Sequence, residues 1–203
     1  MFDLAINRAY YGKNTVLTDF QLTAKKGENI FICGASGIGK STILKIIGGL
    51  HTQYDGSLIF AHENVRISYV PQTVGLLPWK NVLANVTILQ KSERKINKKG
   101  KIDIEKAQQL LETLGLADFA KRYPHQLSGG QRSRVALGQA LFYEPEIILL
   151  DEPFSALDYE TKIATLQLTR EILHGSNITT VLVSHADYEA DFLDCRVVRV
   201  GKS

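Results

Sequence analysis

The stretch Gly34-Ala35-Ser36-Gly37-Ile38-Gly39-Lys40-Ser41 constrains the fold of this chain more than any other. It matches the pattern G-x-x-x-x-G-K-[ST] in full, and it lies between a short apolar run and an apolar stripe with helical spacing. Glycines let the backbone curl until several N–H groups point at one anion, and a helix N-terminus adds positive partial charge. The stretch therefore predicts a phosphate-binding loop between a strand and a helix; a chance glycine-rich turn is the alternative.

Four side chains carry the chemistry expected at such a loop. Lys40 should reach the β- and γ-phosphates of a nucleotide, and the Ser41 hydroxyl should ligate Mg²⁺. Asp151 follows four apolar residues, so it emerges at the carboxyl end of a buried strand, where α/β sheets place ligands. A carboxylate there can hold Mg²⁺ through water. Glu152 comes next and can orient or deprotonate an attacking water; a plain surface acid is the alternative.

Apolar segments alternate with helical patterns along the chain, which favours an α/β core with a largely parallel sheet. Strands are expected at 4–9, 16–22, 29–33, 65–70, 146–150, 178–183 and 196–200. Helices are expected at 40–50, 81–90, 103–114, 131–143, 160–173 and 187–193. Asp103 is the expected N-cap of the third helix and Gly115 its C-terminal stop. The basic residues between Lys91 and Lys101 predict a solvated loop.

Composition excludes several classes of protein. With 203 residues, 44% hydrophobic and 22% charged, the chain is globular rather than disordered. Its two cysteines, Cys33 and Cys195, cannot build a disulfide framework, so we expect a reducing compartment. No run of 18 apolar residues exists, so we expect no membrane span, and the first residues predict no secretory signal. A net charge of +3 does not indicate a nucleic-acid partner, and none is expected.

Further motifs follow in a fixed order. Leu127-Ser128-Gly129-Gly130-Gln131 precedes Asp151-Glu152-Pro153, and Ser155-Ala156-Leu157-Asp158 and then His185 come after it. With Gln72 and the phosphate loop, this set resembles the ABC ATPases over nearly the whole chain. The resemblance implies an α/β fold: a P-loop NTPase core of the ABC ATPase type, with N-terminal antiparallel β strands and an inserted helical subdomain. It implies one ABC ATPase domain over residues 1–203, with the nucleotide-binding core at 1–73 and 135–203 and the helical subdomain, carrying the signature motif, at 74–134.

The same resemblance implies residue roles. Gln72 resembles the Q-loop glutamine, which contacts Mg²⁺ and the water, and His185 resembles the switch histidine at the γ-phosphate; a core histidine is the alternative. Tyr11, or Tyr10 beside it, resembles the aromatic residue that stacks on adenine. The implied nucleotide-binding set is Tyr11, Gly34, Ala35, Ser36, Gly37, Ile38, Gly39, Lys40, Ser41, Thr42, Ser128, Gly129, Gly130, Gln131 and Asp158. The implied metal set is Ser41, Gln72 and Asp151, and the implied catalytic set is Glu152, His185 and Gln72.

ABC ATPase domains bind two ATP molecules between two head-to-tail subunits. The resemblance therefore implies ATP and Mg²⁺ as cofactors, ATP hydrolysis, and a second copy of this chain as partner, with Asp158 at the dimer seam. Ser128, Gly129 and Gly130 precede a helix expected to start near Gln131, and its N-terminus is a second anion site. Because one subunit carries one phosphate loop and one signature, a symmetric dimer closes two complete sites.

A finer resemblance concerns the segment from Gly75 to Val86 and the run Tyr123-Pro124-His125-Gln126. Both are similar to importer ATPases of the nitrate, sulfonate and taurine type. This implies a peripheral subunit at the cytoplasmic face of the membrane that energises a separate permease, supplied by an extracytoplasmic solute-binding protein. Leu76, Leu77 and Trp79 either form a partner-binding surface or only pack the insertion.

Two other kinds of ABC ATPase are alternatives to an importer. An exporter or a cell-envelope mechanical complex uses the same motor, whereas the length leaves no room for the coiled coils or tandem cassettes of ABC ATPases acting on DNA or ribosomes. The sequence also departs from the family pattern. Ala186 stands where an Asp is usual, and Gly138-Gln139 replaces the common Ala-Arg. Neither change removes an implied nucleotide contact.

Overall fold

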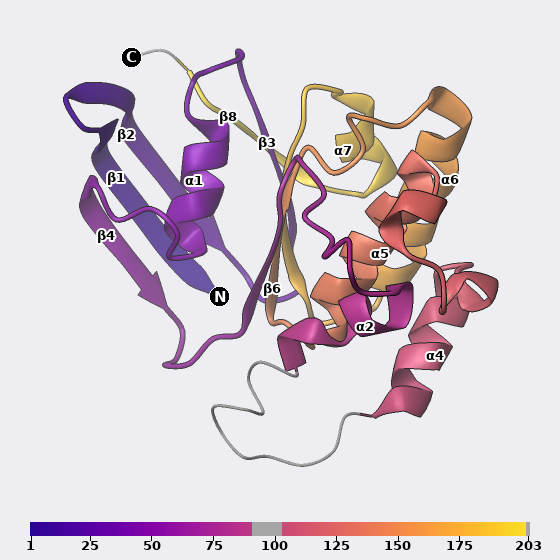
Figure 1. The fold of residues 1–203 in the computed structure, drawn as a ribbon. Helices are drawn as coiled ribbons and strands as arrows, with labels where there is room; N and C mark the ends of the chain where they lie inside the picture. The colour runs from indigo at the N-terminus through magenta and orange to yellow at the C-terminus, as the bar shows by residue number, and fades with distance from the viewer. Residues whose placement is uncertain (91–102, 202–203) are drawn as a thin grey trace.

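The computed structural model describes residues 1–90 and 103–201, and the loop expected between Lys91 and Lys101 lies outside them (Figure 1). The strands are β1 (Phe2–Tyr11), β2 (Asn14–Ala24), β3 (Asn29–Cys33), β4 (Tyr54–Phe60), β5 (Ile67–Val70), β6 (Ile147–Asp151), β7 (Thr179–Val183) and β8 (Arg196–Arg199). The helices are α1 (Lys40–Ile47), α2 (Val82–Val86), α4 (Ile104–Thr113), α5 (Gly129–Phe142), α6 (Tyr159–Leu173) and α7 (Tyr188–Phe192), with 3₁₀ turns η1 (Ala117–Phe119) and η2 (Pro124–Gln126).

The strands form two sheets. An antiparallel sheet has the order β2-β1-β4, and a parallel sheet has the order β5-β6-β7-β3-β8. The expected α/β fold, with a parallel core sheet and antiparallel strands at the N-terminus, is thus confirmed. Seven expected strands and the helices at 40–50, 103–114, 131–143, 160–173 and 187–193 are present with ends shifted by a few residues.

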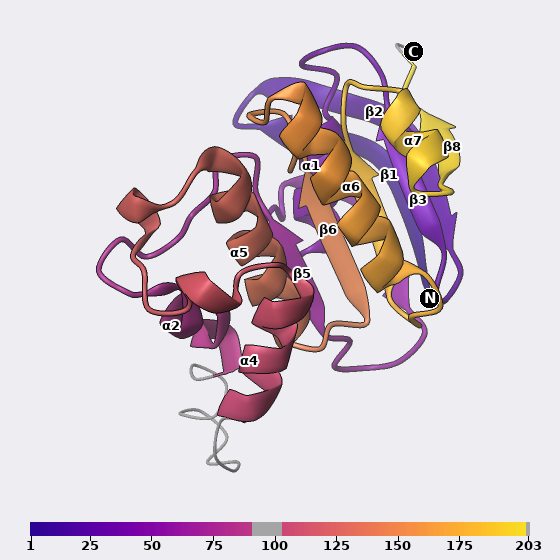
Figure 2. The same ribbon diagram turned by 90° about the vertical axis from the view of Figure 1, so that its right-hand side faces the viewer.

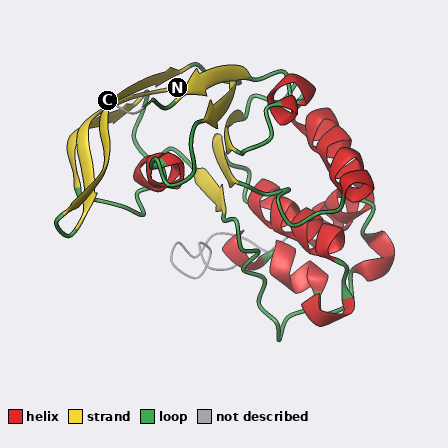
Figure 3. Ribbon diagram, turned by 90° about the horizontal axis from the view of Figure 1, so that it is seen from above, coloured by secondary structure: helices red, strands yellow, loops and turns green. Residues whose placement is uncertain are grey.

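The central strands of the parallel sheet, β3, β6 and β7, are buried on both faces, as expected for strands made mostly of apolar residues. On β3, Ile30 and Ile32 face a core shared with α1 and the antiparallel sheet, while Phe31 and Cys33 face a core formed with α5, α6 and α7. Figure 3 shows α1 enclosed between the two sheets, and Figure 2 shows α5 and α6 covering the opposite face. The phosphate loop and α1 are therefore fixed by the first of these cores.

Capping residues determine where the helices begin. Asp103 accepts a hydrogen bond from the Lys106 backbone N–H, and Gly115 follows α4 with a φ of 64°, as expected for that helix. The helix expected at 81–90 is interrupted, because α2 ends at Val86 and Thr87 is a turn. The expected division at 134/135 falls inside α5, so that division stays a prediction.

The sequence analysis missed β4. Asp55, Gly56 and Ser57 are residues that strands usually lack, and most of β4 is exposed at the edge of its sheet. It forms because β1 supplies a partner: Gly56 pairs with Ile6, and a Cβ at Gly56 would lie 2.0 Å from the Ala5 carbonyl oxygen. In this register the position requires glycine, although glycine weakens the sequence signal for a strand.

No helix in the described ranges, 1–90 and 103–201, is long and apolar enough to cross a membrane. Both Cys33 and Cys195 are free thiols, and burial raises the pKa of the Cys195 thiol to about 12. Cys33 packs in the core, and the Cys195 thiol donates to the Leu193 carbonyl oxygen at 3.8 Å.

Candidate nucleotide site

The phosphate loop connects β3 to α1 and packs against β2. At Gly39, φ is 100° and a Cβ would lie 2.8 Å from the Val16 carbonyl oxygen, so both the conformation and the close approach require glycine. Lys40 is only 5% exposed, and its Nζ donates to the carbonyl oxygens of Gly34 and Ala35 at 2.9 and 3.0 Å. The loop thus holds its own cation at the site where a phosphate would lie.

A cavity of about 340 Å³ lies in front of this loop. Its lining residues come from β2, the phosphate loop, the start of α1 and the segments that follow β5, β6 and β7: Val16, Ser36, Gly37, Gly39, Lys40, Ser41, Thr42, Gln72, Glu152 and His185. The strand register explains how they meet, because Val70 pairs with Leu150, Asp151 with Val183, and Val183 with Ile32. The carboxyl ends of four parallel strands are therefore level, and the segments that follow them converge.

Asp151, buried at the end of β6, is held by two hydroxyl groups. Ser41 Oγ donates to Asp151 Oδ1 at 2.9 Å, and the Tyr69 hydroxyl donates to Oδ2 at 2.7 Å. Burial, together with the hydrogen bond to Asp151, raises the pKa of Tyr69 above its usual value, so the phenol stays a donor. This fixes the orientation of the carboxylate next to the phosphate loop.

Glu152 forms the centre of a second cluster. Gln72 Nε2 donates to Glu152 Oε2 at 2.9 Å, and His185 Nε2 lies 2.9 Å from Oε1. The backbone of Glu152 has a φ of 48°, and its N–H donates to the Val183 carbonyl oxygen at 2.8 Å. A non-glycine residue in this region stores strain, which is common at functional sites. The His185 side chain is 49% exposed, so it is not a core histidine.

The cavity offers oxygen ligands suited to Mg²⁺. Among the described residues, no group of three or more His, Cys, Asp or Glu side chains is placed to hold a metal ion. Mg²⁺ does not need such a cage, because it is commonly bound by one or two protein oxygens together with substrate phosphates. Ser41 Oγ and the Asp151 carboxylate, adjacent to Gln72, supply that kind of donor set.

The remaining predicted residues lie outside this cavity. Tyr11, 43% exposed, has its ring centroid 4.3 Å from that of His51. Ser128 Oγ caps α5 by accepting from the Gln131 N–H at 3.2 Å, so the helix begins at Gly129 rather than near Gln131. Asp158 caps α6 by accepting from the Thr161 N–H at 3.0 Å, and this bond lowers the Asp158 pKa. The first turns of α5 and α6 are in contact, since a Cβ at Gly130 would lie 2.2 Å from Thr161 Cγ2, and neither the signature residues nor Asp158 lines this cavity.

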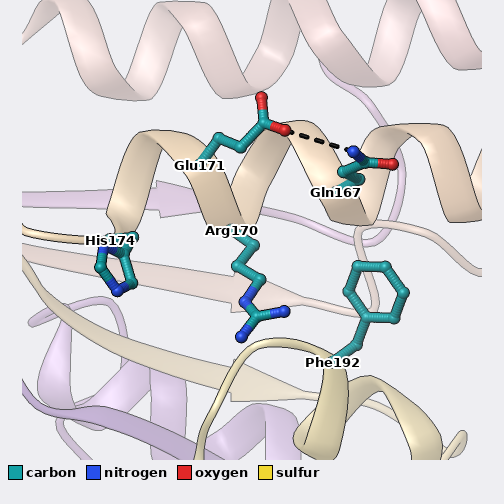
Figure 4. Close-up of a pocket in the computed structure, with 5 residues that line it drawn as sticks. All are labelled: Gln167, Arg170, Glu171, His174 and Phe192. Atoms are coloured by element: carbon teal, nitrogen blue, oxygen red, sulfur yellow. Dashed lines mark hydrogen bonds between the residues drawn. The ribbon is translucent and has the colours of Figure 1, made fainter.

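A larger cavity, of about 500 Å³, lies between α6 and α7 away from the predicted motif residues (Figure 4). Its lining residues are Gln167, Arg170, Glu171, His174 and Phe192. Arg170 is paired with Asp194, and Gln167 donates to Glu171, so two of its polar side chains are already engaged within the chain. Size alone therefore does not identify the functional site.

Leu76 and Trp79, in the apolar segment after Gln72, differ in burial. Trp79 is 69% exposed, whereas Leu76 is partly buried and packs against the core formed with α2 and α5. The insertion is therefore packed by Leu76, and Trp79 remains on the surface. Sequence reasoning also missed Tyr69, whose only signal was its phenol hydroxyl on the strand that precedes Gln72.

Comparison with known proteins agrees with this geometry. The family model for the ABC transporter matches residues 17–155. The aliphatic sulfonates import ATP-binding protein SsuB 1 of Xanthomonas axonopodis pv. citri is 38% identical over 196 residues, which cover 94% of this chain and 77% of that protein. The sulfate/thiosulfate import ATP-binding protein CysA of Neisseria meningitidis serogroup B is 39% identical, over 89% of this chain and 53% of that protein.

One solved structure resembles the fold over its full extent. The dimeric post-hydrolysis state of the ATP-binding cassette MJ0796, bound to ADP and Pi, superposes with a TM-score of 0.83 at 30% identity. The match covers 98% of this chain and 94% of that chain.

Proposed function

The chain belongs to the ABC transporter family, and from that premise we propose that it is the ATP-hydrolysing subunit that energises solute import through a separate membrane permease. The observation that carries the proposal is the convergence, at one cavity, of the phosphate loop, the Ser41–Asp151 hydrogen bond and the Gln72–Glu152–His185 cluster. These are the groups that nucleotide hydrolysis requires: an anion cradle, oxygen ligands for a cation, and a base.

The residues divide the work of hydrolysis. Lys40 and the loop N–H groups bind the phosphates, and Ser41 and Asp151, with Gln72 beside them, would hold Mg²⁺. When bound, Mg²⁺ neutralises charge on the phosphate oxygens. Glu152 orients the attacking water and accepts its proton, and the contacts with Gln72 and His185 fix the direction of its carboxylate. Positioning and charge stabilisation supply the remainder of the rate enhancement.

The partner and solute follow from the relatives. Both importer proteins compared above are named for sulfur oxoanions, so we propose an aliphatic sulfonate or a related small anion as the solute. The proposed assembly has two copies of this chain, with ATP between them, on the cytoplasmic face of a permease, and a solute-binding protein on the opposite side. Ser128, Gly129, Gly130 and Asp158 would contact the nucleotide held by the partner copy.

A reconstitution experiment tests this proposal. The purified subunit should hydrolyse ATP with Mg²⁺, and hydrolysis should rise when it is placed in vesicles with its permease and a loaded binding protein. Labelled ethanesulfonate is the probe, with sulfate and nitrate as competitors. ATP-dependent accumulation on the far side from this subunit would contradict import and favour the exporter alternative, and absence of ATP hydrolysis would contradict the enzyme.

A further inference from the structure

A carboxylate is buried in the core directly beneath the loop that carries His185. Glu189 belongs to α7 and is 1% exposed, and its Oε2 has no hydrogen-bond partner among the described residues. Its Oε1 lies 3.7 Å from Lys162 Nζ of α6, and the Lys162 side chain is 16% exposed. Burial raises the pKa of Glu189. The hydrogen bond from Ser184 and the charge of Lys162 lower it, but they do not cancel the effect of burial. An ion pair in such a place is a poor source of stability, because desolvation offsets most of the attraction.

The pair is connected to His185 by a tight turn. Ser184 Oγ accepts from the Ala186 N–H at 3.3 Å, and the Glu189 N–H donates to the Ala186 carbonyl oxygen at 3.0 Å. His185 lies inside this turn, with its imidazole against Glu152. The position of Glu189 therefore determines where the turn, and with it the His185 side chain, is held.

Lys162, the other member of the pair, lies on the helical turn that contacts the signature. Lys162 lies in the first turn of α6, where its N–H donates to the Asp158 carbonyl oxygen at 2.9 Å. In the same turn, Thr161 contacts the start of α5 so closely that a Cβ at Gly130 would lie 2.2 Å from Thr161 Cγ2. This one helical turn thus contacts the signature on one side and the His185 loop on the other.

We propose that the buried Lys162–Glu189 pair positions His185 against Glu152. Through the first turn of α6, the pair also couples the position of His185 to the signature residues 127–131 of the same subunit. Both are positioning residues, since neither lines the nucleotide cavity. The inference rests on the proposed function, in that His185 is taken to act on ATP. A charged pair suits this purpose better than an apolar contact because it specifies one arrangement of two helices.

The test removes the charges singly and together. We expect Glu189→Gln and Lys162→Met each to lower kcat about tenfold with the KM for ATP unchanged, because the phosphate loop is intact. The double variant should lose no more than the worse single variant, since the two residues act as one unit. Lys162→Arg, which keeps the charge, should retain most of the activity. The double variant, which leaves no unpaired charge, provides the folded protein if a single variant does not fold.

A matched control lies on the same two helical segments. Arg170 of α6 pairs with Asp194 after α7 at 2.8 Å, with side chains 48% and 61% exposed, and Figure 4 shows Arg170 among the residues that line the other cavity. Asp194→Asn should leave kcat unchanged. A second readout needs no hydrolysis: the imidazole NMR signals of His185 in ATP-free protein should shift in Glu189→Gln and not in Asp194→Asn.

Two results would overturn the inference. One is an unchanged kcat and His185 spectrum in a folded Lys162→Met/Glu189→Gln variant. The other is an equal change in the Asp194→Asn control. A wild-type protein that hydrolyses no ATP contradicts the proposed function instead, and the His185 spectrum still decides whether the pair positions that side chain.

Discussion

Glu152 has a positive φ and a backbone hydrogen bond to Val183, and its carboxylate contacts Gln72 and His185. These contacts restrict the conformations that the carboxylate can adopt. Strain of this kind costs about 1–3 kcal/mol and persists only where neighbours enforce it. Glu152→Gln keeps the shape and removes the base. We expect turnover to fall about 10²–10⁴-fold while ATP still binds, so that an ATP-bound dimer accumulates. Turnover and gel-filtration mass with Mg-ATP measure this, and Glu171→Gln on α6 is the control. Near-normal turnover would contradict the role of Glu152.

Tyr69 gives a second prediction at this scale, because its hydroxyl is a donor to a buried carboxylate. Tyr69→Phe leaves Asp151 Oδ2 without that donor, which costs about 1–3 kcal/mol. We expect the melting temperature of the nucleotide-free protein to fall by several degrees. Tyr159→Phe, at a side chain that is 73% exposed, should leave it unchanged. Equal melting temperatures for the two variants would show that the Tyr69 bond contributes nothing.

At the scale of elements, the segment between β5 and α2 contains one residue that packs against the core, Leu76, and one that is exposed, Trp79. Trp79→Ala should leave the melting temperature and ATP binding nearly unchanged, because Trp79 is 69% exposed. It should weaken association with the permease by about 2 kcal/mol or more if this aromatic residue fills a partner pocket. Leu76→Ala should instead lower the melting temperature, since Leu76 packs against the core. Co-purification and thermal melting of both variants distinguish these effects. Normal co-purification of Trp79→Ala would contradict the docking role.

The elements also show what a sequence can predict. Strands such as β3 and β6 each contain four consecutive apolar residues, and the sequence locates them to within a residue because burial on both faces determines their composition. In contrast, β4 was missed, since its form depends on pairing with β1 and on the space at Gly56. The phosphate-loop motif indicated Ser41, and the end of a buried strand indicated Glu152. Gln72 and His185 were expected from the resemblance to the ABC ATPases, and all four line one cavity. Tyr69 and Glu189 were not, because their partners are distant in sequence.

At the scale of the whole molecule, the signature residues do not line the cavity at the phosphate loop, and we propose that a second copy supplies them to complete the nucleotide site. Lys40→Ala should lower the ATP affinity of the monomer, because it removes a cation from the loop. Ser128→Arg should leave monomer affinity largely intact and abolish the ATP-bound dimer, because Ser128 caps α5 outside the cavity. Equilibrium binding and light scattering measure the two effects. Equal loss of monomer affinity in both variants would contradict the two-copy site.

The strand order has a consequence for the rates at which parts of the site open. β5, which leads to Gln72, is an edge strand paired only with β6 in the described sheet, whereas β6, β7 and β3 each have two neighbours. Backbone amides at a sheet edge exchange with deuterium through small local openings, while interior strands exchange only when much of the fold opens. Releasing Gln72 therefore requires the loss of one short strand, but releasing Lys40, Asp151 or His185 requires disruption of the central sheet. Deuterium uptake should accordingly divide the site into one fast group and three slow ones.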